Sequence, residues 1–107
     1  MENALVDHVN NFFLEAHELM QAKNRDYAGN EDPLKNFRMA ETLGVTTTGN
    51  AIFVRLLDKV SRAANLLKAD PAVAGESLHD TLIGLANYSA ILDFELRRVN
   101  HPLLQKK

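Results

Sequence analysis

Residues 76–99 read ESLHDTLIGLANYSAILDFELRRV, and their apolar pattern decides the fold. At about 100° per residue, the leucines of this stretch share one face of a helix. Glu76, Asp80 and Asn87 lie together on another side, in a stripe that continues with apolar residues. We therefore expect both sides of this helix to be covered, with the carboxylates at the mouth of a groove. The leucines are Leu78, Leu82, Leu85, Leu92 and Leu96, and the stripe continues with Ile83, Ile91 and Phe94.

Outside this stretch, three more helices are predicted from apolar spacing and from residues that begin or end helices. Apolar residues near the N-terminus recur every three or four positions, which is typical of an amphipathic helix. Gly44 suits the position after a helix end, the threonines at 46–48 offer N-cap hydroxyls, and Pro71 ends the preceding helix at Asp70. The first three expected helices span about Glu2–Lys23, Asn36–Leu43, and Gly49 or Asn50 to Ala69. The last helix is expected to begin between Pro71 and Glu76 and to end at Val99.

No segment alternates apolar and polar residues, so no strand is predicted and the fold class is all-α. We expect a single domain over residues 1–107, with a core at about 2–100 and a C-terminal tail at 101–107 that frays from Leu103. Three long helices and one short helix predict an up-and-down bundle, with an open side that a second subunit could cover. The polar stretch Asn24–Lys35 is expected to be a loop, and loops of this length are often functional.

Composition and charge exclude several classes of function. The 107 residues include no cysteine, which excludes disulfides and cysteine-based metal sites, so any metal would be held by oxygen or histidine. A net charge of −2 argues against generic nucleic-acid binding. We read neither a signal-peptide pattern nor an apolar run long enough to span a bilayer, so we expect a cytoplasmic protein, in the host cytoplasm if a phage encodes it.

Glu76 and Asp80 are the first candidates for chemistry. They are four residues apart, so their carboxylates stand one turn above each other on one helix face. Like charges in this arrangement repel unless a cation bridges them, and oxygen ligands of this kind suit Mg²⁺ or Mn²⁺. The alternative is that acidic residues in a first helical turn interact favourably with the helix dipole and have no other role.

A second candidate is a charged stripe on the preceding helix. Arg55, Asp58, Arg62 and Asn65 form it, with Lys59 beside it, and the apolar residues of the helix lie roughly opposite. Such a stripe is typical of a solvent-facing helix with alternating charges. The functional interpretation is that guanidinium and ammonium groups next to a metal-binding carboxylate clamp a polyphosphate.

The segment KNRDYAGNEDPLKNF, residues 23–37, is the third candidate. It joins cations to aromatic and amide side chains, which could stack on a base and hydrogen-bond to its edge. The alternative is a solvated loop whose aromatic residues cap the core. The four histidines add no site, and no catalytic Ser/His/Asp order or glycine-rich phosphate loop is readable. The cations are Lys23, Arg25 and Lys35, the aromatic residues are Tyr27 and Phe37, and the amides are Asn24 and Asn36.

Three blocks, KNRDYAGNEDPLKNF (23–37), VRLLDKVSRAANLL (54–67) and ESLHDTLIGLANYSAIL (76–92), together resemble the phage and prophage nucleotide-modification-associated domains. That family is related to the all-α nucleotide pyrophosphohydrolases, the MazG-like and dimeric dUTPase group. The resemblance covers most of the chain, from about Lys23 to Leu92. It implies a helical bundle that forms a homo-oligomer, either a dimer or a tetramer. It also implies Mg²⁺-dependent cleavage of a nucleoside triphosphate between its α and β phosphates.

By position, the resemblance implies a role for each group of candidates. Three carboxylates would hold the metal and serve catalysis, the charged stripe would contact phosphates, and the loop would lie near sugar and base. A metal-activated water would attack while the basic residues balance the developing charge. The metal ligands for Mg²⁺ or Mn²⁺ are Asp58, Glu76 and Asp80, the phosphate contacts are Arg55, Lys59 and Arg62, and the substrate contacts are Lys23, Asn24, Tyr27, Asn36, Phe37 and Asn87.

Two positions depart from the family pattern. The pyrophosphohydrolases usually carry a doubled glutamate motif on the earlier helix, where this chain has Asp58 alone, and the related phage domains often have an acidic residue where this chain has Gly84. Fewer carboxylates predict weaker metal binding. Two alternatives to a hydrolase therefore stay open. One is a catalytically inactive module that binds or sequesters a nucleotide, and the other is a small protein that inhibits a host factor through protein–protein contacts.

Overall fold

A computed structural model describes residues 3–26, 32 and 34–104, and the side chains of these residues except 24–26 and 71–77. Within these ranges the chain forms helices and no strand, which confirms the all-α prediction. Three of the α-helices are long and one is short, as expected. The elements are α1 (Ala4–Asp26), α2 (Lys35–Thr42), α3 (Thr48–Leu66), α4 (Pro71–Arg98) and the 3₁₀ helix η1 (Pro102–Leu104).

The connection between α2 and α3 follows the capping residues that the sequence contains. After α2 the chain turns at Gly44, whose φ of +78° suits glycine because it has no Cβ. α3 begins after Thr47, whose hydroxyl accepts a hydrogen bond from the backbone N–H of Asn50 at 3.0 Å. The Glu41 carboxylate accepts two more, from the N–H and the hydroxyl of Thr48, at 2.8 and 2.7 Å. Local hydrogen bonds therefore set this turn.

Several boundaries differ from the expectation, and α3 ends at Leu66 rather than at Ala69. α1 continues past Lys23 to Asp26, so the loop expected from Asn24 begins later, and its residues 27–31 and 33 lie outside the described part. Within the expected tail at 101–107, residues 102–104 form the 3₁₀ helix η1, and residues 105–107 lie outside the described part. Arg97 Nη1, at the end of α4, donates a hydrogen bond to the carbonyl of Leu104 at 3.2 Å.

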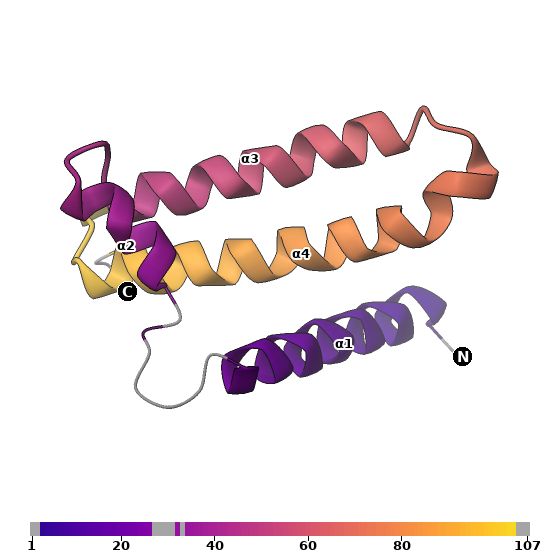
Figure 1. Cartoon of the computed structure of the whole chain (residues 1–107). Coiled ribbons are helices and arrows are strands. Elements are labelled where there is room, and N and C mark those ends of the chain that lie inside the picture. Colours follow the sequence, from indigo (N-terminus) through magenta and orange to yellow (C-terminus); the bar gives the residue numbers. More distant parts are fainter. Residues whose placement is uncertain (1–2, 27–31, 33, 105–107) are drawn as a thin grey trace.

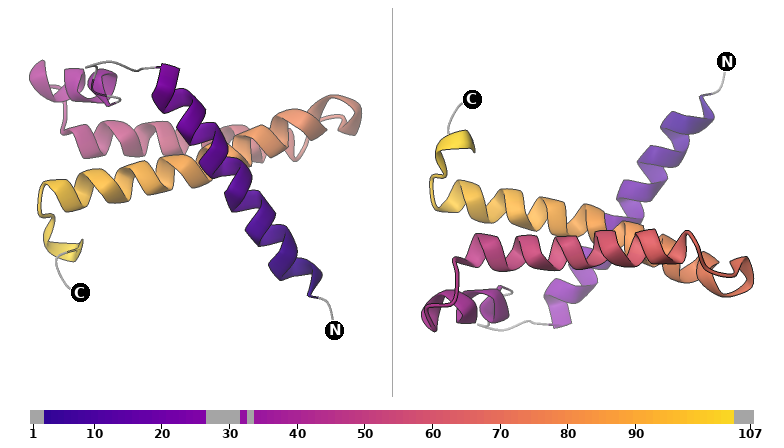
Figure 2. Two further views of the ribbon diagram at one scale, coloured as in Figure 1. Left: turned by 90° about the horizontal axis from the view of Figure 1, so that it is seen from below. Right: turned by 90° about the horizontal axis from the view of Figure 1, so that it is seen from above.

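The bundle is built on an antiparallel hairpin of α3 and α4, which lie side by side (Figure 1). The two helices approach closely at Gly49, where an added Cβ would lie 3.2 Å from Leu96 Cδ2. α1 packs on α4 and crosses the hairpin obliquely rather than along its length (Figure 2). At this crossing, Asn87 Nδ2 donates a hydrogen bond to the carbonyl of Ala16 at 3.2 Å. The hairpin is therefore the element to which α1 and α2 are attached.

The core that one chain buries is small. Ile52 and Ile83 are its largest fully buried apolar side chains. Many large apolar side chains of the described residues stay exposed, among them Phe13 and Phe53. No described helix is both long enough and apolar enough to cross a membrane. The remaining buried apolar residues are Ala16, Leu34 and Ala63, and the buried polar residues are Thr48, Thr81 and Glu95.

Glu95 is a buried charge near the C-terminal end of α4. Its side chain is 1% exposed and accepts hydrogen bonds from Arg38 Nη1 at 3.1 Å and from Arg98 Nε and Nη2 at 3.0 and 2.9 Å. The hydrogen bonds from Arg98, and then those from Arg38, hold the pKa of Glu95 below its ordinary value although burial opposes this. Arg38 also pairs with Asp32. The cluster therefore ties α2 to the end of α4.

Replacing Glu95 by Gln should destabilise the fold, because two guanidinium groups lose their carboxylate. We expect the free energy of unfolding to fall by about 2 kcal/mol, the usual size for a buried hydrogen-bonded charge. Urea denaturation followed by circular dichroism measures this change. The matched control is Asp93→Asn, which breaks an exposed ion pair with Arg97 and should cost less than about 0.5 kcal/mol. Equal losses in the two variants would contradict the role given to Glu95.

Glu95 should also make stability depend on pH at the acidic end. Its pKa is lower in the folded chain than the usual value of 4.5, so the unfolded chain takes up protons first as the pH falls. The contribution of Glu95 to the free energy of unfolding is complete above its pKa in the unfolded chain. It is lost as the pH falls through its pKa in the folded chain. Urea midpoints measured from neutral to acidic pH should drop more steeply for the wild type than for Glu95→Gln. Asp32 and Glu41, whose pKa values are also lowered, contribute to both curves.

Candidate functional site

Two cations of α3 converge on one aromatic ring of α4. The guanidinium carbon of Arg55 lies 5.9 Å, and the ammonium nitrogen of Lys59 lies 6.0 Å, from the centre of the Tyr88 ring. Both distances are within the range of cation–π attraction. Phe37 of α2 meets the same ring edge-on, with the ring centres 6.1 Å apart and the planes at 89°. These four residues, the Tyr88 cluster, bring three helices together on one flank of the hairpin.

Gly84 makes room for Lys59 in the Tyr88 cluster. A Cβ built on Gly84 would lie 3.2 Å from Cε of Lys59 and 3.6 Å from its Nζ. The lysine side chain therefore lies against α4 one turn before Tyr88. Lysine commonly packs its aliphatic stem on an apolar surface while its ammonium group stays near water, and Lys59 is half-buried here. A side chain at position 84 would have to displace it.

Cations outnumber carboxylates on the stripe of α3 that borders the Tyr88 cluster. Arg62 is exposed and lies on the same stripe of α3 as Arg55 and Lys59. Asp58 lies among them, with its carboxylate 3.6 Å from Arg55 Nη1, and the side chains of this pair are 62% and 50% exposed. An ion pair so exposed contributes at most about 1 kcal/mol, so a ligand can displace it at little cost. The stripe can therefore present its cations to an anionic ligand.

The carboxylates expected to hold a metal are described only in part. Asp58 on α3 and Asp80 on α4 are both exposed. Asp80 lies one helical turn before Gly84, which places it on the Lys59 side of the hairpin. Glu76 lies in α4, but its side chain is outside the described part of the structure. Among the side chains that are described, no three histidine, aspartate or glutamate residues gather closely enough to hold a metal ion.

The residues expected near sugar and base are spread over several elements. Phe37 belongs to the Tyr88 cluster, while Lys23 and Asn36 are exposed on α1 and α2. Asn87 is half-buried and its amide nitrogen bonds to α1. Tyr27 and the side chain of Asn24 lie outside the described residues.

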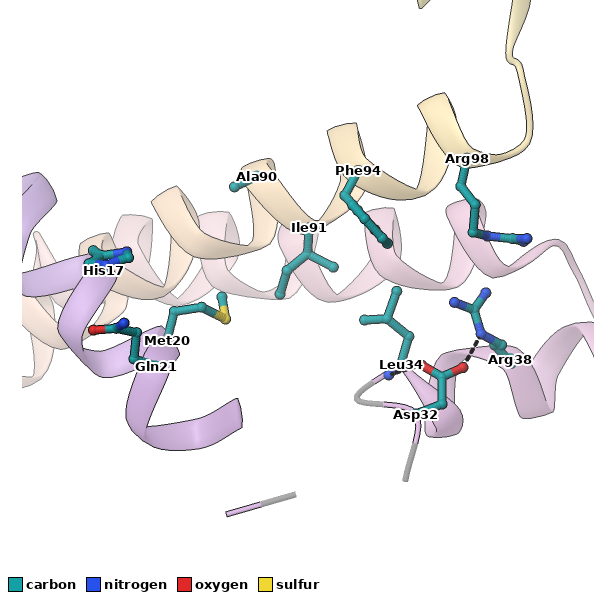
Figure 3. A pocket seen from close by; sticks show the side chains of 10 residues that line it. All are labelled: His17, Met20, Gln21, Asp32, Leu34, Arg38, Ala90, Ile91, Phe94 and Arg98. Carbon is teal, nitrogen blue, oxygen red and sulfur yellow. Dashed lines mark hydrogen bonds and ion pairs between the residues drawn. The ribbon is translucent and has the colours of Figure 1, made fainter. Parts of the chain in front are cut away.

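A cavity of about 490 Å³ lies between α1, α2 and α4 (Figure 3). The guanidinium groups of Arg38 and Arg98 face each other at one end of it. Asp32 and Glu95 balance their charges, so this end is polar but close to neutral. The cavity therefore suits an apolar or aromatic group better than a free phosphate. Its apolar wall comprises Met20, Leu34, Ala90, Ile91 and Phe94.

The sequence analysis did not identify Tyr88 or Glu95 as important. Tyr88 shares a helix face with Gly84, four residues before it, but which face meets the charged stripe depends on how the two helices are rotated against each other. Glu95 lies among the apolar residues of α4, but a glutamate is rarely buried unless it is paired. Its burial could therefore be expected only if its partner were known. Its partner Arg38 is 57 residues away in the chain, so no local pattern links the two.

Comparison of the chain with models of protein families, with curated proteins and with solved structures gives no match in any of the three.

Gly84→Ala should separate two effects of this glycine. Alanine favours a helix by about 1 kcal/mol over glycine, so the free energy of unfolding should rise by up to that amount. The new Cβ would lie 3.2 Å from Lys59 Cε, so the lysine has to move relative to Tyr88. NMR measures this, because the ε-methylene protons of Lys59 should lose part of the ring-current shift from Tyr88. Tyr88→Leu supplies the reference position without the ring, and an unchanged Lys59 signal in Gly84→Ala would contradict the contact.

Proposed function

We propose that this protein binds a nucleotide at the Tyr88 cluster and hydrolyses it as a Mg²⁺-dependent nucleoside triphosphate pyrophosphohydrolase. The observation that carries the proposal is the convergence of Arg55 and Lys59 on Tyr88, at 5.9 and 6.0 Å, beside the carboxylate of Asp58. Cations and a carboxylate in one small region suit a ligand that brings both phosphates and a metal ion. The resemblance of the three sequence blocks to the nucleotide-modification-associated domains supports the same proposal.

The phosphates are the part of the ligand that the charged stripe would bind. The guanidinium groups of Arg55 and Arg62 offer planar, paired N–H donors that match phosphate oxygens, and Lys59 adds a compact charge between them. The chain has a net charge of −2, so this local positive region, rather than the overall charge, would attract the anion.

The metal in this proposal is Mg²⁺ or Mn²⁺, held by Asp58, Glu76 and Asp80. These are hard oxygen donors from both helices of the hairpin, which is the chemistry that these ions prefer. The bound ion would polarise a phosphoryl oxygen and orient water. Arg55, Lys59 and Arg62, which lie on one stripe of α3 beside Asp58, would balance the charge of the phosphates. The reaction consumes one water and yields a nucleoside monophosphate and pyrophosphate.

The sugar and base would lie toward the segment that contains Phe37. Asp32 and Leu34 of that segment line the apolar cavity, whose wall is suited to a flat ring. We further propose that the protein acts in the cytoplasm and that it forms a homo-oligomer, either a dimer or a tetramer.

Release of pyrophosphate from a panel of nucleoside triphosphates tests the hydrolase proposal. Turnover should require Mg²⁺ or Mn²⁺ and stop with EDTA. Asp80→Asn should lower kcat at least about 100-fold, because a ligand of the ion that stabilises transition-state charge is lost. The control is Asp93→Asn, since Asp93 lies on the same helix in an exposed ion pair with Arg97 and should leave activity unchanged. No turnover of any nucleotide in the panel with either metal would exclude the enzyme.

A nucleotide-binding module without hydrolysis is the second candidate, and the position of Lys59 over Gly84 favours it. The ammonium group of Lys59, a residue of α3 that lies against α4 at this point, would balance phosphate charge without a metal ion. The same nucleotide panel, measured by thermal shift in EDTA, distinguishes the two candidates because a ligand that binds the folded state raises Tm. A shift that is reduced in Arg62→Ala, without pyrophosphate release, would support the module. The absence of both turnover and thermal shift would contradict both candidates.

A further inference from the structure

The cavity between α1, α2 and α4 has a wall that suits a planar ring. Its volume of about 490 Å³ lies within the range of roughly 300–1,000 Å³ that is typical of small-molecule sites. Ile91 and Phe94 extend from α4 toward Leu34 on the opposite side of the cavity (Figure 3). Leu34 is buried, whereas Phe94 is 60% exposed although it lines the cavity. An exposed aromatic ring beside apolar side chains offers a surface on which a flat ligand can stack.

The polar end of this cavity places a hydrogen-bond donor next to an acceptor. Asp32 Oδ1 accepts a hydrogen bond from the backbone N–H of Leu34 at 2.9 Å, and Oδ2 accepts one from Arg38 Nε. Arg38 Nη1 in turn donates to Glu95 at 3.1 Å. A carboxylate accepts about four hydrogen bonds and a guanidinium group donates about five, so Asp32 and Arg38 keep capacity for a ligand. Because these bonds already fix both side chains, a ligand does not have to order them.

The charges at the polar end favour an uncharged ligand over a free anion. The carboxylates of Asp32 and Glu95 balance the guanidinium groups of Arg38 and Arg98. A charged ligand would leave this cluster unbalanced. An uncharged ring whose edge carries both an N–H donor and an acceptor atom can instead bond to Asp32 and Arg38 together. The bases of nucleic acids are planar rings with such edges.

We infer that the cavity binds a planar, uncharged heterocycle, which stacks on Phe94 and hydrogen-bonds through its edge to Asp32 and Arg38. This binding needs neither a phosphate nor a metal ion. Tyr88 lies three residues before Ile91, so the wall of the cavity begins about one helical turn from the Tyr88 cluster on α4. A nucleotide could therefore place its phosphates at the charged stripe and its base in the cavity. Only this last step, in which the ring is the base of a nucleotide, rests on the proposed function.

Titration of the full chain with adenosine, guanosine, cytidine and uridine, followed by NMR without phosphate or metal ions, tests the inference. At least one nucleoside should bind and shift the signals of Ile91 and Phe94. Phe94→Ala removes the stacking surface and should weaken binding about 5-fold or more. Ala90→Trp places a large ring in the cavity at an exposed position and should weaken binding at least as much. The matched control is Ser89→Trp, because Ser89 is exposed outside the cavity lining and the variant should bind like the wild type.

Asp32→Asn tests the hydrogen bonds at the edge of the ring. The substitution replaces one acceptor oxygen by an N–H donor of similar size. It should therefore change which of the nucleosides binds most tightly. An unchanged order of affinities in this variant would contradict the contact with Asp32, because stacking on Phe94 alone does not read the edge.

The outcomes separate this inference from the proposed function. Nucleoside binding that is lost in Ala90→Trp, without pyrophosphate release from any triphosphate, would support the cavity site and contradict the hydrolase. A wild type that binds no nucleoside at millimolar concentration, but still releases pyrophosphate from a triphosphate, would overturn the inference and leave the hydrolase standing. Equal weakening in Ala90→Trp and Ser89→Trp would also overturn it. Circular dichroism of each variant confirms that the binding is compared between folded chains.

Discussion

The close contact between α3 and α4 is the constraint on which the rest of the structure depends. At Gly49 and Gly84 the absence of a side chain lets Leu96 and Lys59 lie directly against the opposite helix. This contact sets the rotation of the two helices about their axes. It turns Arg55 and Lys59 toward Tyr88 on one flank and leaves apolar residues on the other. The charged site and the exposed apolar residues of the other flank, Phe53, Leu57, Val60 and Leu82, are thus two results of a single packing arrangement.

The chain handles positive charge in two different ways. Near the end of α4, Arg38 and Arg98 bond to a carboxylate that is almost fully buried, so their charges are balanced within the fold. At the Tyr88 cluster, two cations share one aromatic ring and the nearest acidic partner is an exposed aspartate. Removing one partner from a buried, compensated cluster destabilises the fold, because it leaves an unpaired charge in the interior. A cluster of cations that is half-exposed and has few carboxylate partners is better suited to binding an external anion.

Local signals were enough to predict the elements but not how they meet. The turn at Gly44 and the cap at Thr47 formed as expected, because both depend on hydrogen bonds and backbone geometry within a few residues. The extension of α1 to Asp26 and the 3₁₀ helix η1 were not expected from the local pattern. The site divides in the same way. The charged stripe on α3 was readable from helical spacing, whereas Tyr88 became part of it only through packing.

The sequence by itself determined the all-α class, the order and approximate length of the helices, and which residues of α3 share a charged stripe. These follow from periodicity and capping, which act over one or two helical turns. The tertiary structure alone decided that Lys59 lies over Gly84 and that Glu95 is buried between arginines of different helices. It also decided that α1 crosses the hairpin obliquely, with Leu5 and Phe13 left exposed. Those outcomes depend on the relative rotation and crossing of helices, which is set by contacts between residues far apart in the chain.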